Sequence, residues 1–254
     1  MIHVIEKYDN ISPLFAGWPE TMIWSCLQNV MGRILANDNE HPTAAMAVLG
    51  DFCFLAGEPD KELAACMPAY CQKDFIIMVP QTDAWAEIIE ECQKERAKKV
   101  TRYAFRKEGD IFDRDFLKSA AEGLSDAYQM KMIDETLFDR CRALPWCKDL
   151  AALWDEYAQY QKYGLGVVIL KDGEIVSGAS SYSGYIGGIE IEIDTREDYR
   201  RKGLAFAAGA GLILECLKRG LYPSWDAQNK WSAALAKKLG YHDSHAYTAY
   251  EVCI

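Results

Sequence analysis

The sequence predicts an α/β fold, because segments with the period of a strand alternate with segments that suit a helix. Residues 75–79 (FIIMV) form a short apolar run that is typical of a strand buried on both faces. Residues 189–194 (IEIEID) alternate apolar and acidic side chains with the two-residue period of a strand. Residues 204–218 form a long apolar-rich segment followed by Gly220, which predicts a helix and its C-terminal stop.

The N-terminal half is expected to be a mixture of short helices and strands. Pro59 and Asp60 suit the start of a helix that continues through Cys66. Trp85, Ile88 and Cys92 recur on one side of a second helix. Helices are thus expected at 21–27, 60–66 and 85–96, and strands at 32–36, 44–55 (one long strand or a pair), 75–79, 100–106 and 128–133.

The segment 135–163 is expected to be helical with an interruption at Pro145, and we place the boundary between two parts at its start. The predicted domains are 1–135, an N-terminal α/β domain, and 136–254. No Gly/Ser linker separates them, so we expect the two parts to pack against each other. Asp172-Gly173 predicts a hairpin turn. It joins the first two strands expected in the C-terminal half, 165–170 and 175–183. Further strands are expected at 189–194, 221–226 and 247–252, and helices at 204–218 and 229–239.

The charge balance argues against a nucleic-acid partner. The formal net charge is -10 at pH 7, whereas a nucleic-acid binder needs a basic face. The most basic stretch, Lys94 to Lys107, is diluted by Glu95 and is better interpreted as a solvated helix end. We find no run of about 18 apolar residues that would suggest a membrane span, and no pattern of a secretory signal at the N-terminus. A cytoplasmic protein without nucleic-acid or membrane partners is expected.

The cysteines and histidines do not predict a metal site. There are nine cysteines, mostly among apolar neighbours. Neither Cys66 with Cys71 nor Cys141 with Cys147 has the two-residue gap of a zinc knuckle. We therefore expect reduced cysteines in the core and no metal.

The strongest chemical signal is the turn Arg200-Arg201-Lys202-Gly203-Leu204-Ala205, between a predicted strand and a predicted helix. Backbone N–H groups at a helix N-terminus bind a pyrophosphate well. Gly203 and Ala205 let the backbone approach a phosphate closely, and the three cations add positive charge. Alone, this hexapeptide fits equally well a solvated basic turn in front of an ordinary helix.

The order of the elements around the turn resembles that of a known protein family. A hairpin, a strand, the basic turn, a helix and a strand are followed by Asn229, Ser232, Gly240 and Tyr241. This order resembles the GNAT superfamily of N-acetyltransferases, whose turn reads (Gln/Arg)-x-x-Gly-x-(Gly/Ala) and whose next helix starts at Asn and ends in a Gly-aromatic pair. The resemblance implies that the C-terminal part is a mixed, mostly antiparallel sheet flanked by helices. The N-terminal half would be a degenerate copy of the same fold that lacks the basic turn.

The resemblance also implies acetyl-CoA as the cofactor. The backbone of Ile193, Asp194 and Thr195 would bind the pantetheine arm. The pyrophosphate would be held by the charged and backbone groups of the turn, which are Arg200, Arg201, Lys202, Gly203, Leu204 and Ala205. Asn229 would bond the pantetheine or orient the thioester, with Ser232 beside it on the same helix. Asn229 also suits a helix N-cap, and both roles are compatible.

A general base is expected on the acidic strand, because an amine must lose a proton before it attacks a thioester. Glu190, Glu192 and Asp194 alternate and therefore share one face. Glu192 is the first choice for the base and Glu190 the second. The alternative is an acidic, solvent-facing side of a sheet, and a β-bulge in this strand would change the facing.

The general acid is less well defined. Many family members have a tyrosine seven residues after the Asn, and the residue here is Ala236. Tyr241, Tyr247, Ser232 or water could instead protonate the leaving thiolate. Trp225 and Trp231 flank the Asn motif; core packing is their expected role, with lining of an acceptor pocket as the alternative.

We therefore expect an acyltransferase that moves an acetyl group from acetyl-CoA to an amine by direct attack in a ternary complex. The acceptor is a small-molecule or peptide amine that the sequence does not identify. One alternative is a non-catalytic protein that binds or senses acyl-CoA, because Ala236 replaces the usual acid. Another is a structural or interaction protein that retained the fold alone. A homodimer also stays open.

Overall fold

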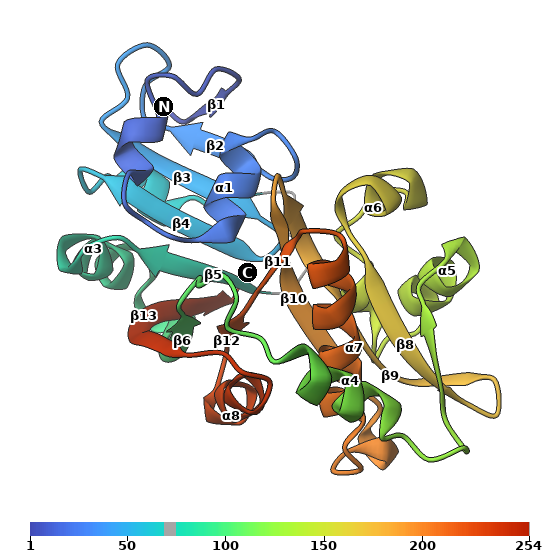
Figure 1. The fold of residues 1–254 in the computed structure, drawn as a ribbon. Coiled ribbons are helices and arrows are strands. Elements are labelled where there is room, and N and C mark those ends of the chain that lie inside the picture. Colours follow the sequence, from blue (N-terminus) through green and yellow to red (C-terminus); the bar gives the residue numbers. More distant parts are fainter. Residues whose placement is uncertain (69–74, 254) are drawn as a thin grey trace. The chain divides into compact units, whose positions relative to one another are not determined.

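The computed structural model describes residues 1–68 and 75–253 (Figure 1). The chain divides into two compact units, one made of residues 1–102 and 246–254 and the other of residues 103–245. The C-terminal segment therefore returns to the first unit. The domain boundary expected at residue 135 falls inside the second unit. The division into domains 1–135 and 136–254 stays a prediction.

The first unit is built on a sheet with the strand order β1-β2-β3-β4-β5-β13-β6. Strands β1 to β4 pair antiparallel, β4 and β5 pair parallel, and β13 pairs antiparallel with β5. The strands are β1 His3–Ile5, β2 Arg33–Ala36, β3 Ala44–Leu49, β4 Phe52–Gly57, β5 Phe75–Pro80, β6 Ala97–Phe105 and β13 Asp243–Cys253. The helices are η1 Ser12–Phe15, α1 Thr21–Leu27, α2 Lys61–Ala65, α3 Asp83–Gln93 and η2 Lys94–Arg96.

The second unit is built on a sheet with the order β11-β10-β9-β8-β7. Strands β7 to β10 pair antiparallel, and β10 pairs parallel with β11. The strands are β7 Gln129–Met132, β8 Gly166–Lys171, β9 Glu174–Tyr185, β10 Gly188–Thr195 and β11 Tyr222–Ser224, and β12 Asp226–Ala227 pairs with the end of β6. The helices are α4 Arg114–Glu122, α5 Glu135–Ala143, η3 Lys148–Leu150, α6 Tyr157–Tyr163, η4 Glu197–Tyr199, α7 Leu204–Lys218 and α8 Lys230–Lys238.

Helix α7 packs on one face of the second sheet. Ile189 and Ile191 of β10 share a core cluster with the apolar residues of α7, and α4 lies beside α7. The opposite face is covered by the segment around η3. There the Trp154 indole N–H donates to the Ser181 carbonyl at 2.9 Å, and Leu150 lies over Gly178. Both faces of the sheet are thus covered within the unit.

The two units repeat one order of elements (Figure 1). In each, four antiparallel strands are followed by a helix, a parallel fifth strand and a further helix, which are α2, β5 and α3 in the first unit and α7, β11 and α8 in the second. This order is the one expected of a degenerate copy. The copies differ where the first of these helices begins, because the Asp60 carboxylate caps α2 at the Leu63 amide and Glu62 follows in its first turn. An acidic helix start does not attract phosphate.

Most expected elements are present. Asp172 (φ 51°) and Gly173 (φ 82°) form the hairpin turn, as predicted. The segment 44–55 is a pair of strands, and the helical segment after Glu135 is divided into α5, η3 and α6. Strand β1 and helices η1 and α4 have no counterpart in the predictions. The start of α4 carries a readable signal, since Asp113 accepts from the amides of Asp115 and Phe116.

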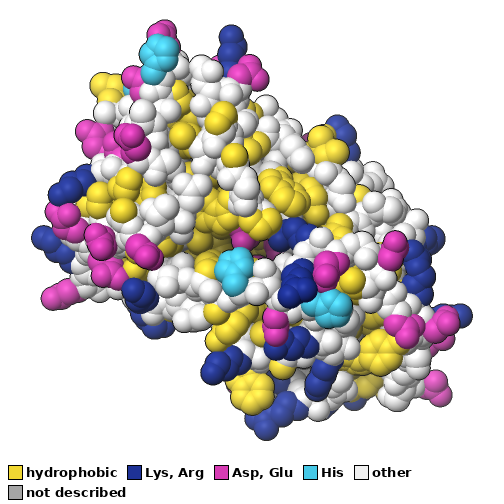
Figure 2. Space-filling view, turned by 60° about the vertical axis from the view of Figure 1, so that its left-hand side comes forward, with side chains coloured by type: hydrophobic (Ala, Val, Ile, Leu, Met, Phe, Trp, Pro, Cys, Tyr) yellow, Lys and Arg dark blue, Asp and Glu magenta, His cyan; other side chains and the backbone are white. Residues whose placement is uncertain are grey.

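The described residues carry mixed charges and free thiols. Figure 2 shows acidic and basic side chains interspersed over the face that it draws. The eight described cysteines are free, and Cys71 lies outside the described residues. Among the described residues, no group of three or more His, Cys, Asp and Glu is arranged to hold a metal ion. Within the same residues, none of the helices has the length and apolar composition that a membrane crossing requires.

Buried thiols make the fold sensitive to alkali. Burial raises the pKa of the Cys26 and Cys216 thiols from 9.0 to about 12. Above pH 9 the unfolded chain releases these protons and the folded chain keeps them, so the free energy of unfolding falls as pH rises toward 12. Each thiol should cost about 1 kcal/mol of stability between about pH 9 and 10, measured by urea denaturation under reducing conditions. Cys216→Ala should flatten this dependence, whereas Cys253→Ala, at an exposed position, should not; equal slopes in both variants would contradict the prediction.

Candidate functional site

The parallel pairing of β10 with β11 is short. Gly188, Ile189 and Glu190 pair with residues 222–224 of β11. Strand β11 ends at Ser224, whereas β10 continues to Thr195. The edge of β10 beyond Glu190 therefore extends past the end of its neighbour. The backbone of an edge strand is suited to pairing with an added extended chain.

The end of β10 leads through η4 into the basic turn. Arg201 (φ 59°) and Gly203 (φ 81°) are both left-handed, and Gly203 is the residue before α7. No side chain caps the N-terminus of α7, and its first turn contains no acidic residue. A Cβ added at Gly203 would meet no heavy atom within 4 Å, so the positive φ, and not packing, requires glycine there. An uncapped helix start beside three cations can bind an anion.

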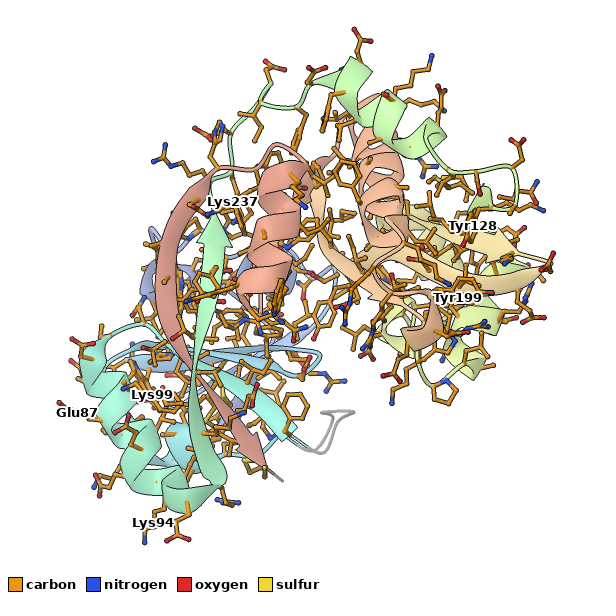
Figure 3. The ribbon with its side chains drawn as sticks, turned by 90° about the horizontal axis from the view of Figure 1, so that it is seen from below. Glu87, Lys94, Lys99, Tyr128, Tyr199 and Lys237 are labelled. Atoms are coloured by element: carbon orange, nitrogen blue, oxygen red, sulfur yellow. The ribbon has the colours of Figure 1, made fainter. Side chains whose placement is uncertain are left out.

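Tyr199 of η4 holds cations next to this turn. The Lys202 ammonium lies 4.4 Å and the Arg196 guanidinium 4.6 Å from the centre of its ring. Tyr128 meets the Tyr199 ring edge-on at 6.4 Å (Figure 3), and the Lys171 ammonium lies 5.7 Å from the Tyr199 ring. Cations over an aromatic face are attracted by the quadrupole of the ring. The positive charge of the turn is thereby kept close to the start of α7.

Three buried polar side chains form a row across the sheet where β10 and β11 part. Glu190 pairs with Ser183 of β9 on one side and with Ser224 of β11 on the other. Directly paired residues project from the same face of a sheet. The exposed fractions are 0% for Ser183, 5% for Glu190 and 1% for Ser224. The hydroxyl groups of Ser183 and Ser224 make no hydrogen bond with any residue that the structure describes.

A β-bulge lies next to this row. The register shifts between Glu190 and Ile191, because Ile191 pairs with Ser181 and leaves Tyr182 as the extra residue of β9. The extra residue is on β9, so β10 keeps its own alternation. Its isoleucines pack in the α7 core, and its carboxylates share the opposite face, as expected. Glu190 is buried and Glu192 and Asp194 are half-buried, so the face is not simply acidic and solvent-facing.

Tyr241, the predicted acid, lies in the core. Its ring packs edge-on against Phe112 at 4.9 Å and Trp225 at 5.5 Å. Its hydroxyl donates to the Pro223 carbonyl at 2.6 Å, and burial raises its pKa well above the usual value. This bond fixes β11 just before Ser224. A proton for a thiolate would require the Tyr241 hydroxyl to leave that carbonyl. Ala236 is buried in the same core cluster.

The start of α8 combines a cap with an exposed aromatic ring. Asn229 caps the helix, its side-chain oxygen accepting from the amides of Trp231 and Ser232 at 2.9 Å each. The Ser232 hydroxyl accepts from the Trp225 indole at 3.1 Å. The predicted core packing is confirmed for Trp225, which is 5% exposed, and is wrong for Trp231, which is 86% exposed. Trp231 is exposed because the buried stripe of α8 consists of Ala233 and Ala236.

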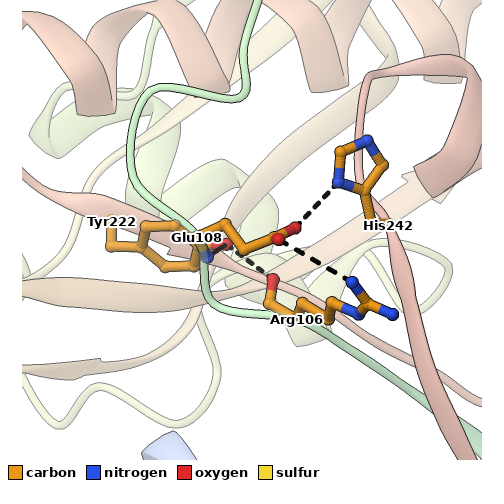
Figure 4. Close-up of polar contacts among 4 residues, drawn as sticks. All are labelled: Arg106, Glu108, Tyr222 and His242. Carbon is orange, nitrogen blue, oxygen red and sulfur yellow. Dashed lines mark hydrogen bonds and ion pairs between the residues drawn. The ribbon is translucent and has the colours of Figure 1, made fainter.

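A polar cluster beside β11 has no counterpart in the sequence predictions (Figure 4). The Glu108 carboxylate lies 2.8 Å from His242 Nδ1 and 3.9 Å from the Arg106 guanidinium. The Tyr222 hydroxyl donates to the Arg106 carbonyl at 3.0 Å and accepts from the Glu108 amide at 3.3 Å. Burial raises the pKa of Tyr222 to about 12, so this donor keeps its proton at neutral pH. The cluster links Tyr222, the first residue of β11, to the segment after β6. Its residues are too far apart in the sequence for a local pattern to predict these contacts.

Comparison with known proteins places these features in a family. The chain matches the model of the GNAT acetyltransferase family over residues 12–250. It is 25% identical over 256 residues to an uncharacterised N-acetyltransferase, YdfB of Bacillus subtilis, and the match covers 96% of this chain and 95% of that protein.

Solved structures agree. A GCN5-related N-acetyltransferase-like protein from Streptococcus suis is 46% identical with a TM-score of 0.90, and 95% of this chain and 96% of that chain are covered. A putative GNAT-family acetyltransferase from Novosphingobium aromaticivorans is 17% identical with a TM-score of 0.54 over 91% and 96% of the two chains, which shows a shared fold alone. With a family match across both units and a solved relative of high identity, this chain belongs to the GNAT acetyltransferase family, whose general activity is acetyl transfer.

Proposed function

We propose that this protein transfers the acetyl group of acetyl-CoA to an amine by direct attack in a ternary complex. The observation that carries the proposal is the junction of two features in the second unit. The edge of β10 extends past the end of β11, and the same strand leads into the uncapped, basic start of α7. A cofactor with an extended pantetheine arm and a pyrophosphate matches both the free strand edge and the basic helix start.

The cofactor would lie along this junction. The pantetheine arm pairs with the backbone of Ile193, Asp194 and Thr195. The pyrophosphate accepts hydrogen bonds from the backbone of Arg201 to Ala205, and Arg200 and Lys202 add charge. The cap uses the side-chain oxygen of Asn229, so its amide NH₂ group is the one that would donate to the pantetheine or the thioester. Ser232 accepts from Trp225 and would donate its own proton to the cofactor.

The chemistry needs a neutral amine and a protonated leaving group. A carboxylate on the face opposite α7 takes the proton of the amine, with Glu192 as the first candidate and Glu190 as the second. The amine nitrogen then forms the C–N bond with the thioester carbon, and the C–S bond breaks as the nitrogen releases its second proton, which replaces the proton that the thiolate takes up. The thiolate takes a proton from Ser232 or water, or from Tyr241 if that hydroxyl leaves the Pro223 carbonyl. The acceptor is a small-molecule or peptide amine.

The second candidate function is a non-catalytic sensor of acyl-CoA, which the buried Ala236 at the position of the usual acid favours. A sensor would bind acetyl-CoA and release no free thiol with any amine in a panel. An enzyme would release one thiol for each amide formed.

Gly203→Ala tests the pyrophosphate site. Gly203 (φ 81°) and Gly173 (φ 82°) are both left-handed and have no heavy atom within 4 Å of an added Cβ, so alanine at either position costs about 1–2 kcal/mol of backbone strain. Only Gly203 lies in the proposed cradle. We expect Gly203→Ala to weaken acetyl-CoA binding at least about tenfold in calorimetry. Gly173→Ala should lose similar thermal stability and keep its affinity. Equal affinities in the two variants would refute the assignment.

Replacement of Asn229 separates its two roles. Serine is about as good an N-cap as asparagine but has no amide, so Asn229→Ser should keep the melting temperature and lose affinity for acetyl-CoA or turnover, by about tenfold for one hydrogen bond. Asn229→Ala should also lose about 1 kcal/mol of stability. Wild-type binding and turnover in the serine variant would leave Asn229 with the capping role alone.

A further inference from the structure

We infer that Tyr199 is a positioning residue of the proposed pyrophosphate site. Its ring keeps the ammonium groups of Lys171 and Lys202 next to the basic turn. Arg196 neutralises Asp198, which leaves both lysines available to the phosphates of the cofactor. The inference rests on the proposed acetyl transfer. It assigns to these residues the preference for a thioester that carries phosphates over one that consists of a pantetheine arm alone.

The ring of Tyr199 has a fixed position. The Arg196 amide donates to the Val176 carbonyl of β9 at 3.0 Å, and the Tyr199 amide donates to the Arg196 carbonyl at 2.9 Å. The half-buried ring packs against the core cluster of α7 and meets the Tyr128 ring edge-on at 6.4 Å. A lysine side chain is flexible in solution, so a fixed ring beside it reduces the number of conformations that it samples.

Among the described residues, two of the cations around this ring have no carboxylate partner. The ammonium groups of Lys202 and Lys171 lie 4.4 Å and 5.7 Å from the centre of the Tyr199 ring, and neither lysine forms an ion pair. Lys171 is the last residue of β8, whereas Lys202 belongs to the basic turn, so the ring gathers cations from two segments. A ring quadrupole attracts an ammonium group without neutralising it, so both charges remain available to an anion.

Arg196 has a different role, because its charge is paired with a carboxylate. Its Nε donates to Asp198 Oδ1 at 2.8 Å and its Nη2 donates to Asp198 Oδ2 at 3.0 Å. These hydrogen bonds lower the pKa of Asp198, so its carboxylate is ionised at neutral pH. Asp198 also interacts electrostatically with Lys202, and an unpaired carboxylate at this position would repel a phosphate. Arg196 therefore acts by removing the negative charge of Asp198 from the site.

The first test uses Tyr199→Phe and Tyr199→Leu, with Tyr163→Leu as the matched control. The Lys162 ammonium lies 4.7 Å from the centre of the Tyr163 ring. Tyr163 lies beside Gly184, at the end of β9 that is far from the basic turn. Affinities for acetyl-CoA and for acetyl-pantetheine are measured by calorimetry at low and at high salt, and stability is measured by thermal unfolding.

Tyr199→Phe should keep the wild-type affinity, because the ring is retained. Tyr199→Leu should lose about fivefold in affinity for acetyl-CoA and depend less on salt, since fewer oriented charges meet the phosphates. Its affinity for acetyl-pantetheine, which has no phosphate, should not change, whereas a folding defect would weaken the binding of both thioesters. Tyr163→Leu should show wild-type affinity and salt dependence. Equal acetyl-CoA affinities in the two leucine variants, or a loss in Tyr199→Phe as large as in Tyr199→Leu, would overturn the inference.

Arg196 and Asp198 provide an independent test. Arg196→Gln should lose about fivefold in acetyl-CoA affinity, because it leaves the Asp198 carboxylate unpaired beside the cations. Asp198→Asn, added to that variant, should restore the wild-type affinity, since no carboxylate then needs to be neutralised. A double variant that binds as weakly as Arg196→Gln would show that Arg196 contacts the phosphates itself and would overturn its assigned role.

The same measurements separate this inference from the proposed acetyl transfer. A wild type that binds acetyl-CoA but releases no thiol with any amine would refute the transfer and leave the role of Tyr199 standing. A wild type that binds acetyl-CoA no more tightly than acetyl-pantetheine would overturn the inference. Thiol release with an amine would still support the transfer in that case.

Discussion

The ladder between β10 and β11 ends after Glu190 and Ser224, and the rest of the candidate site depends on that end. Because β10 extends to Thr195, its outer edge is available to an extended cofactor arm, and its continuation through η4 brings the basic turn to the start of α7. Two tyrosines, the half-buried Tyr222 and the buried Tyr241, fix β11 on the other side. Tyr222 bonds the backbone after β6, and Tyr241 bonds the Pro223 carbonyl. A longer ladder would occupy the edge that the proposed cofactor uses.

The first unit keeps the same order of elements but has a capped, acidic helix start in place of an uncapped, basic one. Its parallel pair, β4 and β5, is also separated by a helix, yet the side chain of Asp60 occupies the start of α2 and Glu62 follows it. In the second unit the corresponding start has no capping side chain and is preceded by three cations. Strand order is maintained by apolar packing, which both units share. Affinity for an anion depends on a few charges at one helix start.

Sequence reasoning succeeded where the signal is local. The bounds of α7, the Asp172-Gly173 turn and the capping position of Asn229 follow from caps, turns and periodicity within a few residues. It could not reach features that depend on pairing between distant segments. The bulge on β9 and the row of Ser183, Glu190 and Ser224 require the strand register. The exposure of Trp231 was within reach, because Ala233 and Ala236 already define the buried stripe of α8.

Hydrogen–deuterium exchange with and without acetyl-CoA tests the central claim most directly. Cofactor bound along the end of β10 and the start of α7 should slow exchange of the amides at 191–195 and 201–206. The corresponding positions of the first unit, in β4 and at the start of α2, should exchange at unchanged rates. Slowed exchange at α2, or unchanged exchange along both β10 and the basic turn at saturating acetyl-CoA, would contradict a cofactor site at the end of the β10–β11 ladder.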